Sequence, residues 1–390
     1  MVDLRLGYED WRAEVREFLC AELPPGKEFY LDYDEDDERW KFAVEFSKKV
    51  ADRGWIGLTW PRQYGGLERS LIEQYILTEE FHLAEAPLIN LIGWSLAAGI
   101  LLYGGTEAQK SAMLPDIAGM RTIWAEGLTE PGAGSDLAGL TTTAARSPHG
   151  THWLVRGQKT YTTFGARSDV LLTIARTDPD RPRRQEGLSI FAVDLRAPGV
   201  TIQPLWNIAG GRQNHIFLDD VAVPDSHLIG EVNRGWEYIT RSFYAGGVPF
   251  LRHSTMERKY RMLLDYCNRT SRGGQLLIDQ AGNRDRLAEM SVMIEAQRVL
   301  AETALSDSVH GRRSDAGAMY QVLAKECIPR FAQLAYEVAG PLAQLSRQAS
   351  YAALGGEVQA WYLQSFGNHA AGTPQIKRMV LATRSLGLPR

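Results

Sequence analysis

The chain has 390 residues, of which 44% are hydrophobic and 23% are charged, and its formal net charge is −4. A chain of this length and composition can bury a large core and is expected to form two or three structural units. The small negative charge offers no basic face of the kind on which nucleic-acid binders depend, so we expect no nucleic-acid partner. Three scattered cysteines without Cys-x-x-Cys spacing favour neither a disulfide framework nor a metal site.

The first residues, Met1 to Arg5, lack the basic and then apolar build of a secretion signal. No apolar run in the sequence approaches the length of a membrane span. We therefore expect a cytoplasmic protein that has no membrane partner.

Residues 1–120 are predicted to form an N-terminal helical domain. Apolar residues recur there at helical spacing, and the pattern is interrupted by the break at Pro24-Pro25-Gly26 and by an acidic stretch that begins at Asp32. The periodic positions are Trp11, Val15, Phe18 and Leu19, followed by Trp40, Ala43, Phe46 and Val50.

Residues 121–232 are predicted to form a middle β domain, either a small barrel or a sandwich. Short runs rich in β-forming residues alternate with clusters of Gly, Pro and Asp that are typical of turns. The runs are Trp153 to Val155, Val170 to Ala175, Leu188 to Val193, Val200 to Ile202 and Ile216 to Val223.

Residues 233–390 return to helical periodicity, so we predict a C-terminal helical bundle. Leu287, Met290 and Ile294 share one predicted helix face, and Met319, Val322 and Leu323 share another. The sequence therefore predicts an α+β multidomain protein in which two helical parts flank one β part.

Several short motifs occur in order along these three parts: Leu128 to Asp136, Gly157 to Thr163, Phe217 to Pro224, Leu228 to Glu231 with Gly235-Trp236, Asn368 to Arg378, and Leu386 to Arg390. In order and spacing they resemble the motifs of acyl-CoA dehydrogenases over nearly the whole chain. The resemblance implies a C-terminal four-helix bundle. It also implies the cofactor FAD, lying between the β domain and that bundle.

The resemblance also implies which residues contact FAD. These are Leu128, Thr129, Gly134, Ser135, Tyr161, Thr163, Arg269, Thr373 and Gln375. Tyr161 stands where the family has a tryptophan, and Arg269 matches an arginine that reaches the pyrophosphate of the neighbouring subunit's FAD. Arg272 departs from the pattern, because the family has an aromatic residue there. Without the resemblance, Pro131 to Ser135 would be interpreted as a turn and Thr373 as a helix N-cap.

The catalytic carboxylate of the family has no counterpart at either of its usual positions. Dehydrogenation of a thioester needs a base beside the α-carbon. The resemblance places a glutamate at position 371 or 246, and this chain has Ala371 and Gly246. Tyr244 and His369 are weak candidates by alignment, because a lone Tyr or His beside an apolar stretch is more often a packed residue than a base. Glu357 lies in the same C-terminal region and is no stronger a candidate.

Three functions are consistent with this sequence. The first is an FAD-dependent acyl-CoA dehydrogenase with a displaced base, which oxidises an acyl-CoA thioester and passes electrons to electron-transfer flavoprotein or a similar acceptor as a homo-oligomer. The second is a non-catalytic subunit of a heterotetramer with a paralogous chain, as in bacterial enzymes that degrade steroid side chains. The third is a flavin oxidase or monooxygenase on the same fold.

Overall fold

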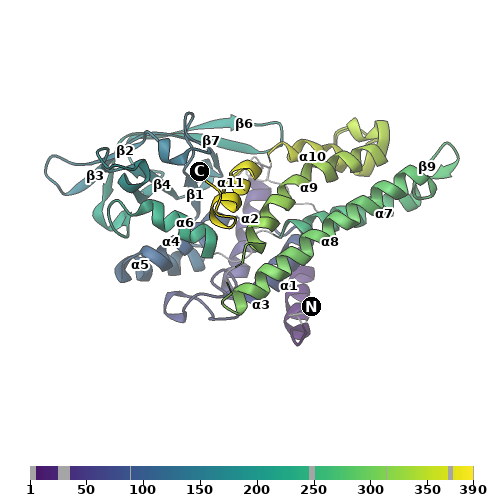
Figure 1. Cartoon of the computed structure of the whole chain (residues 1–390), viewed down its shortest axis with the longest axis horizontal. Helices are drawn as coiled ribbons and strands as arrows, with labels where there is room; N and C mark the ends of the chain where they lie inside the picture. The colour runs from purple at the N-terminus through teal and green to yellow at the C-terminus, as the bar shows by residue number, and fades with distance from the viewer. Residues whose placement is uncertain are drawn as a thin grey trace.

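The computed structural model describes residues 6–24, 36–87, 89–245, 251–312, 314–367 and 372–389, without the side chains of 243–245. Figure 1 shows the β part at one end of the molecule and a small β-hairpin at the other, with long helices running between them. Helical parts precede and follow the β part along the chain, so the predicted α+β fold is confirmed. Within the described residues, no helix combines the length and apolarity needed to cross a membrane.

The N-terminal part is helical because its apolar residues form continuous buried stripes. The periodic positions that the sequence analysis named are buried, except Trp40, which is partly exposed. Capping boxes start two of the helices, at Ser70 with Glu73 and at Thr106 with Gln109. The elements are α1 (Glu9–Glu22), α2 (Asp37–Asp52), η1 (Arg62–Tyr64), α3 (Leu71–Leu83), the π-helix η2 (Ile92–Ala97), α4 (Ala98–Gly104) and α5 (Glu107–Ala118).

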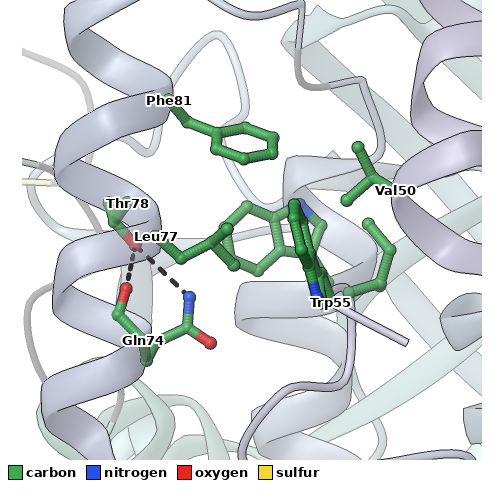
Figure 2. A pocket seen from close by; sticks show the side chains of 8 residues that line it. Val50, Trp55, Gln74, Leu77, Thr78 and Phe81 are labelled. Carbon is green, nitrogen blue, oxygen red and sulfur yellow. Dashed lines mark hydrogen bonds between the residues drawn. The ribbon is translucent and has the colours of Figure 1, made fainter. Parts of the chain in front are cut away.

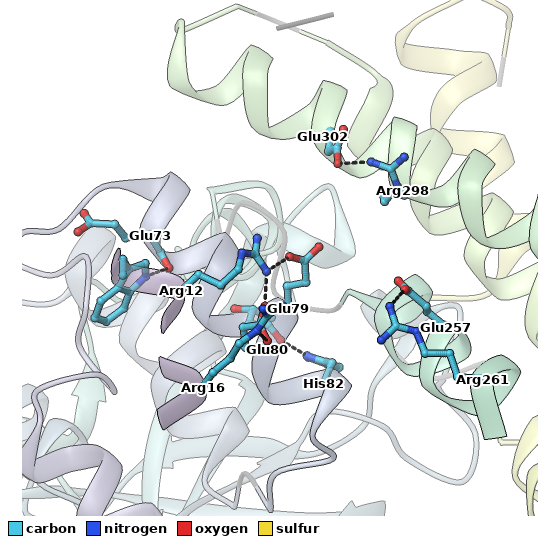
Figure 3. A network of polar contacts seen from close by, with 12 residues as sticks. Arg12, Arg16, Glu73, Glu79, Glu80, His82, Glu257, Arg261, Arg298 and Glu302 are labelled. Carbon is cyan, nitrogen blue, oxygen red and sulfur yellow. Dashed lines mark hydrogen bonds and ion pairs between the residues drawn. The ribbon is translucent and has the colours of Figure 1, made fainter. Parts of the chain in front are cut away.

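A polar network fixes α1 against α3 (Figure 3). Arg12 forms ion pairs with the buried carboxylates of Glu79, at 2.6 Å, and Glu80, and Arg16 donates from Nε to Glu80 at 2.8 Å. Near the end of α3, His82 Nδ1 donates to the carbonyl of Thr78 at 2.7 Å, and burial lowers the pKa of His82 to about 4. His82 is therefore neutral at physiological pH and supports the helix rather than titrating.

The middle part is, within the described residues, an eight-stranded sheet with the strand order β6-β7-β3-β2-β4-β5-β8 and with β1 paired to β4 in parallel. Every predicted β-rich run lies in one of these strands. The strands are β1 (Trp124–Gly127), β2 (Thr143–Arg146), β3 (His152–Thr163), β4 (Val170–Arg176), β5 (Leu188–Asp194), β6 (Val200–Trp206), β7 (Arg212–Pro224) and β8 (Leu228–Ile229).

The two faces of this sheet belong to different hydrophobic cores. Ala125 of β1, Leu171 of β4 and Phe191 of β5 belong to the internal core of the β part. Their alternate neighbours Trp124 and Leu172 belong to a core that includes the N-terminal helices. One face of β1, β4 and β5 thus supports the helical layer.

The C-terminal part consists of long helices around a separate apolar core. Leu287, Met290 and Ile294 are buried as predicted, but Met319 is 48% exposed. The prediction that Met319, Val322 and Leu323 form the buried face of this helix is wrong. Its buried stripe consists of Ala316, Tyr320, Ala324 and Cys327. The elements are α6 (Gly235–Ala245), α7 (Arg252–Arg269), β9 (Ser271–Arg272), β10 (Gln275–Leu276), α8 (Ala281–Val309), α9 (Ala316–Ala339), α10 (Glu357–Ser365) and α11 (Pro374–Arg384).

Candidate functional site

The segment from Leu128 to Ser135 leaves the end of β1 and is held on β3 by a buried ion pair. Lys159 Nζ donates to Glu130 Oε1 at 2.9 Å and to the carbonyl of Ile174 at the same distance, and its side chain is fully buried. The backbone N–H of Thr160 donates to the carbonyl of Thr129 at 2.9 Å. The structure therefore brings the predicted residues Leu128 and Thr129 next to the strand that carries Tyr161 and Thr163.

Glu130 is the centre of this attachment. Its Oε2 accepts from the backbone N–H and the hydroxyl of Thr141, each at 2.7 Å, and its Oε1 accepts from the N–H of Thr142 at 2.9 Å. Burial alone would favour the neutral acid, but Lys159 and these donors lower the pKa of Glu130 to about 2. A permanently charged, fully bonded carboxylate thus fixes the start of the loop.

Beyond Glu130 the chain forms an open turn at the surface. Glu130 and Ala133 exchange backbone hydrogen bonds of 2.9 and 3.1 Å, while Gly134 and Ser135 are exposed. A Cβ added at Gly134 would approach only Thr129 Cγ2, at 3.9 Å. Exposed backbone at Gly134 and an exposed serine beside it would allow a polar ligand to approach closely.

Tyr161 is presented outward by an irregularity in β3. The pairing of β3 with β7 shifts register between Lys159 and Thr162, and Tyr161 within that shift has φ +58°. A bulge changes the direction of a side chain relative to its neighbours, and Tyr161 is 56% exposed. Gln213 of β7 holds the backbone on the other side, since its Nε2 donates to the carbonyl of Tyr161 and to Thr163 Oγ1, both at 3.4 Å.

Arg269 lies far from these residues within one chain. It is at the C-terminal end of α7, beside the β9–β10 hairpin at the opposite end of the molecule from β3 (Figure 1). Its side chain is exposed and donates to Asp265 at 2.9 Å. Arg272 in the hairpin donates instead to the carbonyl of Ala339 and packs on Gly340, so it braces the end of α9.

Of the C-terminal predictions, Thr373 and Gln375 are described. Thr373 is the N-cap of α11, since its Oγ1 accepts from the N–H of Ile376 at 3.2 Å, and Gln375 is exposed on the first turn. Ala371, His369 and Gly246 lie outside the described residues, as does the side chain of Tyr244. Glu357 is buried and accepts from Arg347 Nε at 2.8 Å, so this carboxylate already has a cationic partner.

The π-helix η2 covers the start of β1. Asn90, which has φ +59°, precedes η2 and donates from Nδ2 to the carbonyl of Thr122, while its Oδ1 accepts from the N–H of Trp124, both at 2.8 Å. On the other side of η2, Ser242 of α6 donates to the carbonyl of Leu96 at 3.2 Å. The helix thus connects β1 with the C-terminal half of α6. A π-turn of this kind often marks a functional site.

A small apolar cavity lies between α2 and α3 (Figure 2). Its walls come from α2, α3 and the segment after α2, and Trp94 of η2 completes them. The indole N–H of Trp94 is buried, and no residue of the described part of the chain accepts a hydrogen bond from it. The lining residues are Val50, Trp55, Ile56, Gln74, Leu77, Thr78, Phe81 and Trp94.

One carboxylate in this region, Glu126 of β1, was not predicted from the sequence. Burial raises the pKa of Glu126 to about 7. The signal was present in the sequence: in the run Trp124 to Leu128, Glu126 occupies the alternate position between two large apolar residues, where a strand that faces a core would have a third.

By sequence, three family models match almost the whole chain. The N-terminal, middle and C-terminal domains of acyl-CoA dehydrogenases match residues 8–121, 125–221 and 233–386. The chain is 30% identical to acyl-CoA dehydrogenase FadE26 of Mycobacterium tuberculosis, an alignment that covers 99% of each chain.

By structure, the chain is similar to subunits of two-component complexes. A chain of the ChsE4-ChsE5 complex from Mycobacterium tuberculosis superimposes with a TM-score of 0.89 at 28% identity, covering 100% of both chains. A chain of the Tcur3481-Tcur3483 steroid ACAD superimposes with a TM-score of 0.87 at 27% identity, covering 98% of both.

Proposed function

The chain belongs to the acyl-CoA dehydrogenase family, and on that premise we propose that it is an FAD-dependent subunit that oxidises an acyl-CoA thioester between its α- and β-carbons. FAD is the cofactor of this family. The observation that carries the proposal is the buried Lys159–Glu130 attachment, which holds Thr129 beside the strand of Tyr161 and Thr163.

The residues present fit a flavin. The exposed Tyr161 ring offers an aromatic face, and the hydroxyls of Thr129 and Thr163 offer donors to a ring edge. Gly134 and Ser135 leave open backbone and a hydroxyl for the pyrophosphate side. We propose that these residues and Leu128 hold one cofactor, with Thr373 and Gln375 of α11 completing its surroundings.

When bound, FAD supplies the hydride acceptor of the reaction. The chain then has to orient the thioester, exclude water and accept a proton from the α-carbon. The apolar face of β1 and the π-helix η2 provide the dry surroundings, since Trp124, Leu128 and Leu96 are all buried there. Electrons leave the reduced protein to electron-transfer flavoprotein or a similar acceptor.

The cofactor assignment is tested by purification. We expect yellow protein that releases FAD, and not FMN, when it is denatured, as identified by chromatography and mass spectrometry. The variant Thr163→Val, which removes one hydroxyl and keeps the shape, should retain less FAD at unchanged thermal stability. A colourless protein that ignores added FAD, both alone and when co-expressed with a paralogous chain, would refute the proposal.

A second candidate, a subunit whose partner carries the family's base, is favoured by two observations. The similar solved chains come from two-component complexes, and positions 371 and 246 hold alanine and glycine. Under this proposal, the chain alone reduces its flavin slowly when mixed anaerobically with saturated acyl-CoA thioesters. Ala371→Glu should then raise the rate by roughly 10² or more. Rapid bleaching by the unmodified chain would exclude this candidate.

A further inference from the structure

Gln213 of β7 lies on the same face of the sheet as Thr163, one of the proposed flavin residues. The two are direct partners across β3 and β7, and partners in an antiparallel pair have side chains on the same face. The next pair, Thr162 with Asn214, is buried on the side of Ile216, which belongs to the internal core of the β part. Thr163 and Gln213 are both partly exposed, and they therefore face away from that core.

The contacts of Gln213 fix the orientation of its side-chain amide. Its nitrogen, Nε2, lies 3.4 Å from the carbonyl oxygen of Tyr161 and 3.4 Å from Thr163 Oγ1. A backbone carbonyl only accepts hydrogen bonds, so Gln213 must present its NH₂ group, and not its oxygen, to Tyr161. The two N–H bonds of this group serve the two oxygens. Both distances are long for hydrogen bonds, so these contacts orient the groups and add little to stability.

The contact with Gln213 decides where the hydroxyl proton of Thr163 goes. A hydroxyl has one proton to donate and two lone pairs with which to accept. Because Thr163 Oγ1 accepts from an amide N–H, its own proton has to be donated to another group. In the part of the chain that the structure describes, no group accepts this proton. Thr163 therefore offers a donor to any ligand that brings an acceptor to this face of the sheet.

The backbone acceptors beside Thr163 are already engaged within the protein. The carbonyl of Leu128 accepts from Lys159 Nζ at 3.4 Å, and the carbonyl of Thr129 accepts from the N–H of Thr160 at 2.9 Å. The carbonyl of Tyr161 is engaged as described above. The site thus turns its donors, and not its carbonyls, toward a ligand, which suits a ring edge that carries nitrogen and oxygen acceptors.

We propose that Gln213 is a positioning residue for the cofactor, because it directs the Thr163 hydroxyl to donate a hydrogen bond to the edge of the flavin ring. This inference rests on the proposed function, since it needs bound FAD. Gln213 acts through Thr163, and no covalent bond changes. A hydroxyl that is oriented before the ligand arrives loses less freedom on binding than one that rotates.

The test exchanges the amide of Gln213 for a carboxylate. Gln213→Glu keeps the shape of the side chain, but a carboxylate only accepts hydrogen bonds, so it draws the Thr163 proton away from the flavin. We expect the dissociation constant of FAD, measured by equilibrium dialysis and flavin absorbance, to rise roughly tenfold, as for the loss of one net hydrogen bond. The melting temperature of the apoprotein should stay within about 2 °C, because Gln213 is partly exposed. Gln213→Ala leaves the hydroxyl free to rotate and should have a smaller effect in the same direction.

Two controls separate this effect from added charge and from a general change of structure. Gln203→Glu adds the same charge at an exposed position of β6, whose partner on β7 is His215, two residues from Gln213. The dissociation constant of FAD should then change by less than about twofold. In the background of Thr163→Val, Gln213→Glu should also change it by less than about twofold, because the hydroxyl through which Gln213 acts is gone.

A second readout is the resonance Raman spectrum of bound FAD, because vibrations of the flavin ring respond to hydrogen bonds at its edge. Gln213→Glu should shift these bands in the same direction as Thr163→Val. Unchanged affinity and bands in both Gln213 variants, or an equal loss of affinity in Gln203→Glu, would overturn the inference and leave the proposed function intact. A protein that binds no FAD, or a Thr163→Val variant that binds it unchanged, would overturn both the inference and the proposed role of Thr163.

Discussion

Two glutamates in one short segment show how surroundings decide charge. Glu126 and Glu130 are four residues apart; Glu130 is buried, and Glu126 is partly exposed. Glu130 has Lys159 and three donors, so its pKa falls to about 2, whereas Glu126 has only burial, and its pKa rises to about 7. The first carboxylate is held charged by its partners, and the second changes its charge near neutral pH.

This contrast predicts a pH-dependent stability. Between pH 4.5 and about 7 the folded protein retains a proton on Glu126 that the unfolded chain has lost, so the free energy of unfolding falls as pH rises through this window. The loss is about 3 kcal/mol at most, at 1.36 kcal/mol per pKa unit. Glu126→Gln should therefore be more stable than the unmodified protein at pH 8, with little difference at pH 5, in urea denaturation. Equal stability of the two proteins at both pH values would contradict a raised pKa of Glu126 in the folded protein.

Breaking the Lys159–Glu130 pair is expected to change the free energy of unfolding more than the titration of Glu126 does. Lys159→Met leaves the carboxylate of Glu130 buried without its cation, so we expect the free energy of unfolding to fall by roughly 3 to 5 kcal/mol. The double variant Lys159→Met with Glu130→Gln should be less destabilised than the sum of the two single variants, because each single change leaves one group unpaired. Chemical denaturation of the four proteins measures this coupling.

A surface ion pair of the same sheet serves as the control. Arg146 and Asp225 are about half exposed and pair on the surface of the β part. Asp225→Asn should change the free energy of unfolding by less than about 1 kcal/mol. If Asp225→Asn lowered the free energy of unfolding as much as Lys159→Met does, the effect would come from the loss of a charge and not from burial of the ion pair.

At the scale of elements, the sequence predicted the helical and β parts because periodicity is local. The strands from β3 to β7 were expected from runs such as Val170 to Ala175, and the buried stripe of α1 from Trp11 to Leu19. The bulge at Tyr161 was not expected, since it arises from the pairing of β3 with β7, which lies some fifty residues later in the chain. The position of Glu126 between Trp124 and Leu128 was visible in the sequence, whereas the raised pKa of its carboxyl depends on how the folded chain excludes water from it.

Because the backbone at Tyr161 is left-handed, we expect a substitution there that weakens cofactor binding without affecting the stability of the fold. Glycine adopts φ +58° without strain, and the ring of Tyr161 is largely exposed, so Tyr161→Gly should change the free energy of unfolding by less than about 1 kcal/mol. The same variant should release FAD faster, because it removes the aromatic face. Dialysis followed by absorbance at the flavin band measures the retention, and Tyr161→Trp is expected to restore it.

At the scale of the whole molecule, the proposed cofactor residues occupy two distant places in one chain. Arg269 lies at the far end of α7 and the Tyr161 strand lies in the β part (Figure 1). A single chain therefore does not join them at one cofactor, whereas two chains placed tail to head would.

This arrangement predicts an assembly of at least two chains, formed with itself or with a paralogue. Arg269→Ala should lower FAD retention in the assembly several-fold and leave the melting temperature of the apoprotein within about 2 °C, because its exposed pair with Asp265 contributes little to stability. Light scattering at micromolar concentration gives the state of assembly. A monomer that holds FAD firmly would contradict the shared site.

The π-turn at η2 has a consequence for how such a site changes over generations. A π-turn contains one residue more than the α-helical turn it replaces, and α4 continues directly from it. Deleting one residue there would restore regular pairing and rotate everything that precedes the deletion by about 100° around the helix axis. Trp94 would then leave the wall of the apolar cavity, and another side chain of the helix would take its place there. The insertion or deletion of a single codon in η2 can therefore change which side chains line the cavity, although no residue is substituted.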